Sequence, residues 1–166
     1  MIRSKLRAPA LADTFVDRPR LRARLARLID AHPLTVVSAT AGAGKTSAVI
    51  SAVHELDRPV AWLTVDHTDA APGRLLIYLE ATLAERLPEL AGVAGEALAA
   101  GIPHAETAGL LAESVRDNSL VLVLDNLERL GEAPEAWAVI EAVVRYAPGT
   151  LAVVLVSRRE IPPALC

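Results

Sequence analysis

Cysteine and long apolar runs are scarce in this chain of 166 residues, and each scarcity excludes a class of protein. The single cysteine is the last residue, Cys166, so no disulfide can form within the chain. The longest stretch without Lys, Arg, Asp or Glu covers residues 31–44, which is too short to span a bilayer. Near the N-terminus, Arg3, Lys5 and Arg7 interrupt any apolar core of the signal-peptide kind. The composition therefore predicts a cytoplasmic protein with no membrane association.

The charge is unevenly distributed along the chain. The formal net charge is −3, yet residues 1–30 carry eight basic groups against three aspartates. One interpretation is a basic arm that binds nucleic acid. The spacing of the leucines favours a different one, an amphipathic helix with a solvated arginine face, capped by Asp17 and with Pro19 in its first turn. The apolar positions of that helix are Leu21, Leu25, Leu28 and Ile29.

Lysine is also rare, with two lysines against fifteen arginines, and one lysine lies in a glycine-rich segment. Residues 39–46 read Ala-Thr-Ala-Gly-Ala-Gly-Lys-Thr, between an apolar run at 34–38 and a helical segment. This pattern predicts a phosphate-binding (Walker A) loop, in which glycines let successive backbone N–H groups point at phosphate oxygens. Ala39 stands where the usual pattern has its leading glycine. The predicted nucleotide-binding residues are Ala41, Gly42, Ala43, Gly44, Lys45, Thr46 and Ser47, with Lys45 on the terminal phosphates and the Thr46 hydroxyl on Mg²⁺.

Four short apolar segments alternate with helical segments along the chain. The pattern predicts strands at 34–39, 60–65, 120–124 and 151–156, and helices at about 18–31, 45–56, 72–86, 105–117 and 133–147. Residues 1–16 look irregular, and 88–104 read as short helices or loop. This alternation predicts an α/β fold with a buried parallel sheet between two helical layers. Polar residues follow each strand, where open parallel sheets bind ligands; they are the glycine-rich loop, Asp66, Asp125–Asn126 and Ser157–Arg159.

The third predicted strand is followed by an acid that is expected to complete a magnesium site. Asp125 follows a run of five aliphatic residues and is predicted to hold the Mg²⁺ shell together with Thr46. Asn126 stands where many ATPases place a glutamate that orients the attacking water. An amide cannot accept a proton as a carboxylate does, so hydrolysis is predicted to be slow. Glu128 is either a substitute for that glutamate or a carboxylate that caps the turn.

Two arginines follow the fourth strand. An arginine at this position can contact the γ-phosphate and distinguish ATP from ADP. Strand alternation allows one of the pair to face the site, and Arg158 is favoured over Arg159. The alternative is a solvated pair that precedes the turn at residues 161–163.

Together these motifs resemble the STAND class of signal-transduction ATPases, in particular the nucleotide-binding core of large LuxR-type and maltose-activator-like (NB-ARC-like) bacterial transcriptional regulators. The resemblance implies a P-loop NTPase core at residues 17–166 after an N-terminal segment at 1–16, with Val16 and Arg18 near the adenine. It implies an ADP-bound inactive monomer and self-association after exchange for ATP. It rests on six segments in a consistent order, residues 5–9, 15–21, 41–46, 61–66, 124–128 and 156–158.

The resemblance also implies parts that this chain does not contain. The family's ASCE-type sheet places a neighbour on each side of the first strand, and one neighbour would lie beyond Cys166. The sequence is thus expected to be a fragment or a truncated relative, cut after the sensor strand, with DNA bound only through a domain that is absent here. The strand at 34–39 would then be an open edge prone to pairing with another chain.

Two other function classes remain open at this stage. A small-molecule P-loop kinase would combine the same loop with a mobile lid that carries arginines. The segment that would form this lid, residues 88–104, contains no Arg or Lys, which argues against phosphoryl transfer to a small molecule. A nucleic-acid-binding module would use the N-terminal arginines.

Overall fold

A parallel sheet of four strands forms the centre of the molecule. The structure is a computed structural model that describes residues 1–11, 13 and 15–165, so Cys166 lies outside it. The strands are β1 (Leu34–Ser38), β2 (Val60–Thr64), β3 (Leu120–Asp125) and β4 (Leu151–Ser157). All neighbours run parallel, in the order β1-β4-β3-β2. The α/β class and the parallel sheet are confirmed, and each predicted strand is within one residue of the observed one.

The two central strands are apolar on both faces because helices cover both sides of the sheet. Every residue of β3 and β4 is buried. Leu122 and Leu124 join one core cluster, and Val121 and Val123 join the other, as the two-residue period of a strand requires. A strand buried on both faces reads as a continuous aliphatic run, which is why such runs in the sequence located these strands.

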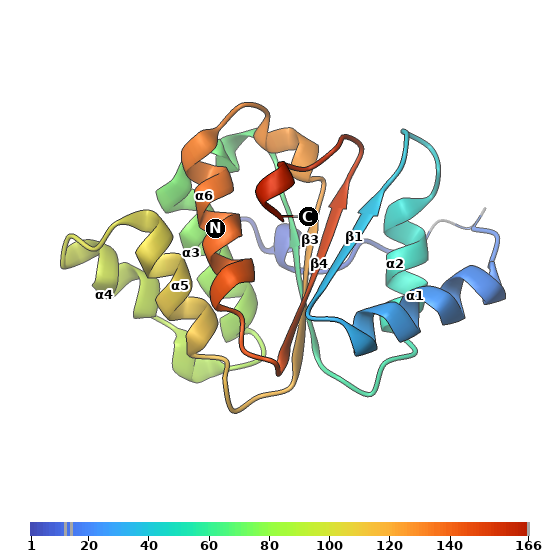
Figure 1. Cartoon of the computed structure of the whole chain (residues 1–166), viewed down its shortest axis with the longest axis horizontal. Coiled ribbons are helices and arrows are strands. Elements are labelled where there is room, and N and C mark those ends of the chain that lie inside the picture. The colour runs from blue at the N-terminus through green and yellow to red at the C-terminus, as the bar shows by residue number, and fades with distance from the viewer. Residues whose placement is uncertain (12, 14, 166) are drawn as a thin grey trace.

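The helices form one layer on each side of the sheet (Figure 1). On one side lie α1 (Pro19–Ala31) and α2 (Lys45–Val53), whose buried residues pack on the face of the sheet that carries Val121 and Val123. The other side is covered by α3 (Pro72–Ala84), α5 (His104–Glu113) and α6 (Pro134–Tyr146), with α4 (Val93–Ala99) outside them. The result is a helix–sheet–helix arrangement. None of the helices in the described ranges has the length and apolar character that crossing a bilayer requires.

The first helix differs from its prediction in two respects. It begins at Pro19 with Arg18 as the N-cap and no side-chain cap, because Asp17 instead pairs with Arg22. Its predicted apolar face is only partly buried, since Leu21 and Leu28 are 37% and 36% exposed. Because α1 packs against α2 as well as the sheet, one narrow stripe around Leu25 and Ile29 meets the core.

Strand β1 lies at the edge of the sheet. It pairs with β4 alone, so its other side has no strand partner among the described residues. Val36 in this strand is 38% exposed, although β3 and β4 are wholly buried. The open edge expected for this strand is confirmed. Whether another chain pairs with it stays a prediction.

Candidate functional site

The connection between β1 and α2 curls at its two glycines. Gly42 and Gly44 have φ angles of 78° and 75°, in the left-handed region that favours glycine. A Cβ added at either position would meet no atom within 4 Å, so conformation rather than crowding selects glycine here. The Ala43 N–H donates to the Thr40 carbonyl at 3.3 Å. The loop therefore has the curled backbone and the open space that a bound phosphate requires.

Lys45 is the first residue of α2 and its side chain returns to the start of the loop. Its Nζ donates to the carbonyl oxygens of Ala39 and Thr40, at 2.7 Å and 2.9 Å. These bonds hold the ammonium beside the loop backbone. A phosphate bound in the curl would therefore meet a positive charge that is already in position.

Thr46 and Asp125 meet across the sheet edge although they are far apart in sequence. The Thr46 hydroxyl lies 3.1 Å and 3.2 Å from the two carboxylate oxygens of Asp125. Burial raises the pKa of Asp125, while hydrogen bonds from Thr46 and from the Asn126 N–H oppose that rise. A hydroxyl and a carboxylate are the hard oxygen ligands that Mg²⁺ takes alongside phosphates. These two residues therefore fit the predicted metal-binding pair.

Glu128 binds both the main chain and the side chain of Arg158. The Arg158 N–H donates to Glu128 Oε2 at 3.0 Å, and its Nε lies 3.2 Å from Oε1. Glu128 thus ties the turn after β3 to the end of β4. Of the two interpretations of Glu128, this geometry favours a carboxylate that caps the turn over one that orients the attacking water.

Only one of the two arginines after β4 shares a cavity with Thr46 and Asp125. Arg158 lines a cavity of about 430 Å³ with Thr46 and Asp125. Arg159 lines a different cavity, which includes Glu132 and Ile161. The structure thus brings the favoured arginine to the site, and its contact with a γ-phosphate stays a prediction.

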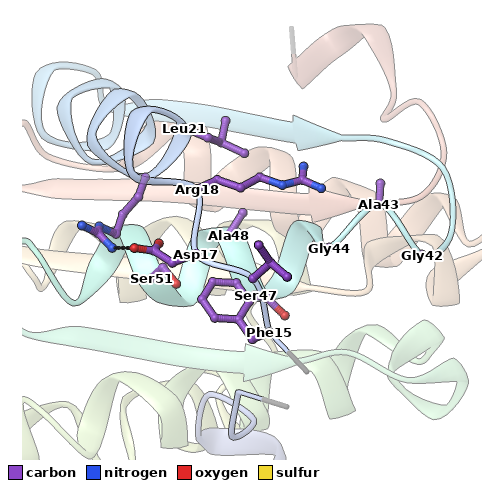
Figure 2. Close-up of a pocket in the computed structure, with 12 residues that line it drawn as sticks. Phe15, Asp17, Arg18, Leu21, Gly42, Ala43, Gly44, Ser47, Ala48 and Ser51 are labelled. Carbon is purple, nitrogen blue, oxygen red and sulfur yellow. Dashed lines mark hydrogen bonds and ion pairs between the residues drawn. The ribbon is translucent and has the colours of Figure 1, made fainter. Parts of the chain in front are cut away.

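A second cavity joins the loop to the chain before α1 (Figure 2). Its volume is about 330 Å³, at the lower end of the range for small-molecule sites. Val16 and Arg18, the predicted adenine neighbours, both line it, and the Arg18 guanidinium points toward Ala43 in Figure 2. Ala41 is exposed and does not line this cavity. The other lining residues are Phe15, Asp17, Leu21, Arg22, Gly42, Gly44, Ser47, Ala48 and Ser51.

The N-terminal segment contributes to the site in a way that the sequence did not predict. Lys5 and Arg7 line the 430 Å³ cavity beside Asp125. Lys5 forms ion pairs with Asp66 and Asp69, which follow β2. Two signals were available in the sequence: residues 5–9 are one of the segments that carry the family resemblance, and Lys5 is the only lysine besides Lys45 in an arginine-rich chain.

Residues 88–104, considered above as a kinase lid, pack away from the loop. Ala94 and Ala97 of α4 are buried, and the Glu80 carboxylate accepts bonds from the N–H groups of Gly92 (3.0 Å) and Ala94 (2.6 Å). In Figure 1, α4 lies at the opposite end of the molecule from α2. The segment is thus held against α3 and α5, and in this arrangement it does not cover the loop.

No protein-family model matches this chain, and a search of curated proteins finds no match.

Proposed function

We propose that this chain is a cytoplasmic P-loop NTPase core that binds ATP and ADP with Mg²⁺. The observation that carries the proposal is the conjunction at the sheet edge of a curled glycine loop, the Lys45 ammonium and the Thr46–Asp125 pair. A triphosphate has the complementary chemistry, because its oxygens accept from backbone N–H groups and share a magnesium ion with hydroxyl and carboxylate ligands. Bound Mg²⁺ would neutralise phosphate charge there.

Different residues of the chain are assigned to the phosphates, the magnesium ion and the base of the nucleotide. Backbone N–H groups of residues 42–46 surround the β-phosphate, and Lys45 exchanges its bonds to Ala39 and Thr40 for oxygens of the terminal phosphates. Thr46 and Asp125 orient the metal. The Arg158 guanidinium leaves Glu128 to contact a γ-phosphate. Val16 and Arg18 lie beside the base in the smaller cavity.

The proposed role is a nucleotide-controlled switch in a signal-responsive bacterial transcriptional regulator, with slow hydrolysis as a reset. Two observations support slow turnover. The residue after Asp125 is an amide, and the nearby carboxylate of Glu128 accepts from the Arg158 main-chain N–H at 3.0 Å, a bond that does not depend on the arginine side chain. Neither side chain is a free base for an attacking water. Self-association in the ATP form and DNA binding through another domain belong to the same proposal.

Calorimetric titration with ATP, ADP and GTP in the presence of Mg²⁺ tests the proposal. We expect binding of ATP and ADP by the unaltered protein, and a loss of at least about tenfold in ATP affinity for Lys45→Met. Arg24→Met, which removes a cation from the exposed face of α1, is the matched control and should bind normally. A melting curve establishes that both variants fold. Equal ATP affinity in Lys45→Met and the unaltered protein would refute the assigned site.

A further inference from the structure

A buried cation anchors the N-terminal segment to the sheet. The Lys5 side chain is 7% exposed; its Nζ lies 3.1 Å from Asp66 and also pairs with Asp69, which is completely buried. The same ammonium lies 4.2 Å from the centre of the Tyr78 ring, and the Ile2 N–H donates to the Tyr78 hydroxyl at 2.9 Å. A buried ammonium needs such partners, because leaving it or its carboxylates unpaired is strongly unfavourable. The chain is thus fixed at the end of β2.

From this anchor the chain runs along the site. We call residues 3–9 the N-terminal strap. Lys5, Arg7 and Pro9 line the cavity that contains Thr46 and Asp125. Leu6 and Ala8 line a different cavity, against Val53 and Trp62, and Arg7 borders that cavity too. Lys5 and Leu6 lie in a short 3-10 helix at Arg3–Leu6, and the chain becomes extended at Arg7, whose angles are φ −132° and ψ 145°.

Arg7 is the cation in this cavity that has no carboxylate partner among the described residues. Lys5 is held by Asp66 and Asp69, and Arg158 is held by Glu128. Arg7 is exposed and lines the same cavity as Asp125 and Thr46, the pair that fits a phosphate-bound magnesium ion. A guanidinium presents paired N–H donors that match phosphate oxygens and stays charged at every physiological pH.

We propose that the N-terminal strap completes the site as a terminal-phosphate subsite, with Arg7 contacting the last phosphate of a nucleoside triphosphate. This inference rests on the proposed function, and it goes further by adding a second contact to the terminal phosphate, besides Arg158, from the N-terminal strap. Lys5 acts as a positioning residue. Its buried pairs hold the strap so that Arg7 reaches the cavity edge without a conformational search.

The test measures the affinities of MgATP and MgADP for four proteins by calorimetry. They are the unaltered chain, Arg7→Ala, Arg7→Lys and the matched control Arg3→Ala. Arg3 lies on the same strap and carries the same charge, but it does not line the cavity. We expect Arg7→Ala to weaken MgATP binding about tenfold, the effect of losing one hydrogen-bonded charge. MgADP affinity and the melting temperature should stay within error, and Arg7→Lys should recover part of the loss.

The outcomes separate this inference from the function on which it rests. Equal weakening of MgATP and MgADP in Arg7→Ala, or a matching loss in Arg3→Ala, would overturn the subsite, because general charge or folding would then explain the effect. An unchanged MgATP affinity would also overturn it while leaving the glycine loop intact. Failure of the unaltered chain to bind either nucleotide would instead refute the proposed function itself.

Discussion

Replacing Lys5 by methionine is expected to destabilise the fold strongly, although the residue lies in a segment that looks irregular in sequence. The substitution keeps the aliphatic stem against Tyr78 and removes the only buried cation beside Asp69, which has no exposed surface. Removing one partner of a buried ion pair costs about 3–5 kcal/mol. The lower part of that range is expected here, because Arg74 Nε remains 3.6 Å from Asp69.

The free energy of unfolding by urea, followed by circular dichroism, measures this effect. A domain of this size loses about 2–4 °C of melting temperature per kcal/mol, so a destabilisation of about 3 kcal/mol, the lower end of that range, corresponds to a fall of about 6–12 °C. Arg22→Met is the control, since Arg22 also pairs with two carboxylates, Asp17 and Glu55, but at the surface. That control should change stability little.

A second substitution checks the physical cause. Asp69→Asn keeps an acceptor for the Asp66 N–H while it removes the buried negative charge. Combined with Lys5→Met, it should recover much of the lost stability, and the difference from additivity measures the coupling between the two groups. A destabilisation by Lys5→Met below about 1 kcal/mol, or no recovery in the double variant, would refute the buried-pair reasoning.

The same cluster makes a prediction about pH. Hydrogen bonds from the Thr68 hydroxyl and amide, together with Lys5, hold the pKa of Asp66 well below its ordinary value of 3.8. Because the pKa of Asp66 is lower in the folded than in the unfolded protein, its carboxylate stabilises the fold fully at pH values above its ordinary pKa. This stabilisation is lost as the pH falls toward the pKa of the folded state. The stability difference between the unaltered chain and Lys5→Met should therefore shrink below about pH 4.

Three further substitutions test the site. Burial raises the pKa of Asp125, so ionisation of this carboxyl opposes folding as the pH rises through that pKa. Asp125→Asn should therefore raise the melting temperature at neutral pH. The same substitution should weaken magnesium-dependent nucleotide binding in calorimetry. Asn126→Glu should raise ATP turnover at least about tenfold in a phosphate-release assay, and an unchanged rate would contradict the explanation of slow hydrolysis. Gly44→Ala should lower the free energy of unfolding by about 1–2 kcal/mol, because residue 44 has a left-handed backbone. Gly95→Ala, in α4 with open space around it, should raise that free energy by about 0.4–1 kcal/mol. Equal effects of the two substitutions in urea denaturation would contradict this assignment.

The parts of the fold that the sequence predicted well are those with a local pattern. The aliphatic run before Asp125 located a buried strand, because strands covered on both faces need no polar alternation. The glycines at 42 and 44 located the loop, since few other residues adopt its backbone. The contact between Thr46 and Asp125 could be predicted because Asp125 ends β3, while Thr46 begins the helix after the loop of β1, and both lie at the carboxyl edge of the parallel sheet.

The parts that were missed depend on contacts between distant residues. Lys5 pairs with Asp66 and Asp69 across 61 and 64 residues, and nothing periodic marks an irregular segment as part of the core. The exposure of Leu21 was missed for a similar reason. Helical spacing indicates which residues share a face, but the packing of α1 on α2 decides how much of that face is covered.

The main chain after β3 restricts what the site can become. Asn126 has a φ of 64°, the one non-glycine residue with a positive φ in the described part of the chain. Asparagine tolerates this conformation, while a longer side chain such as glutamate adopts it at a penalty of about 1–2 kcal/mol. The faster turnover expected of Asn126→Glu would therefore be accompanied by a loss of stability at this corner. The left-handed turn at Asn126 thus favours the amide over a glutamate, and with it the slow hydrolysis of the proposed switch.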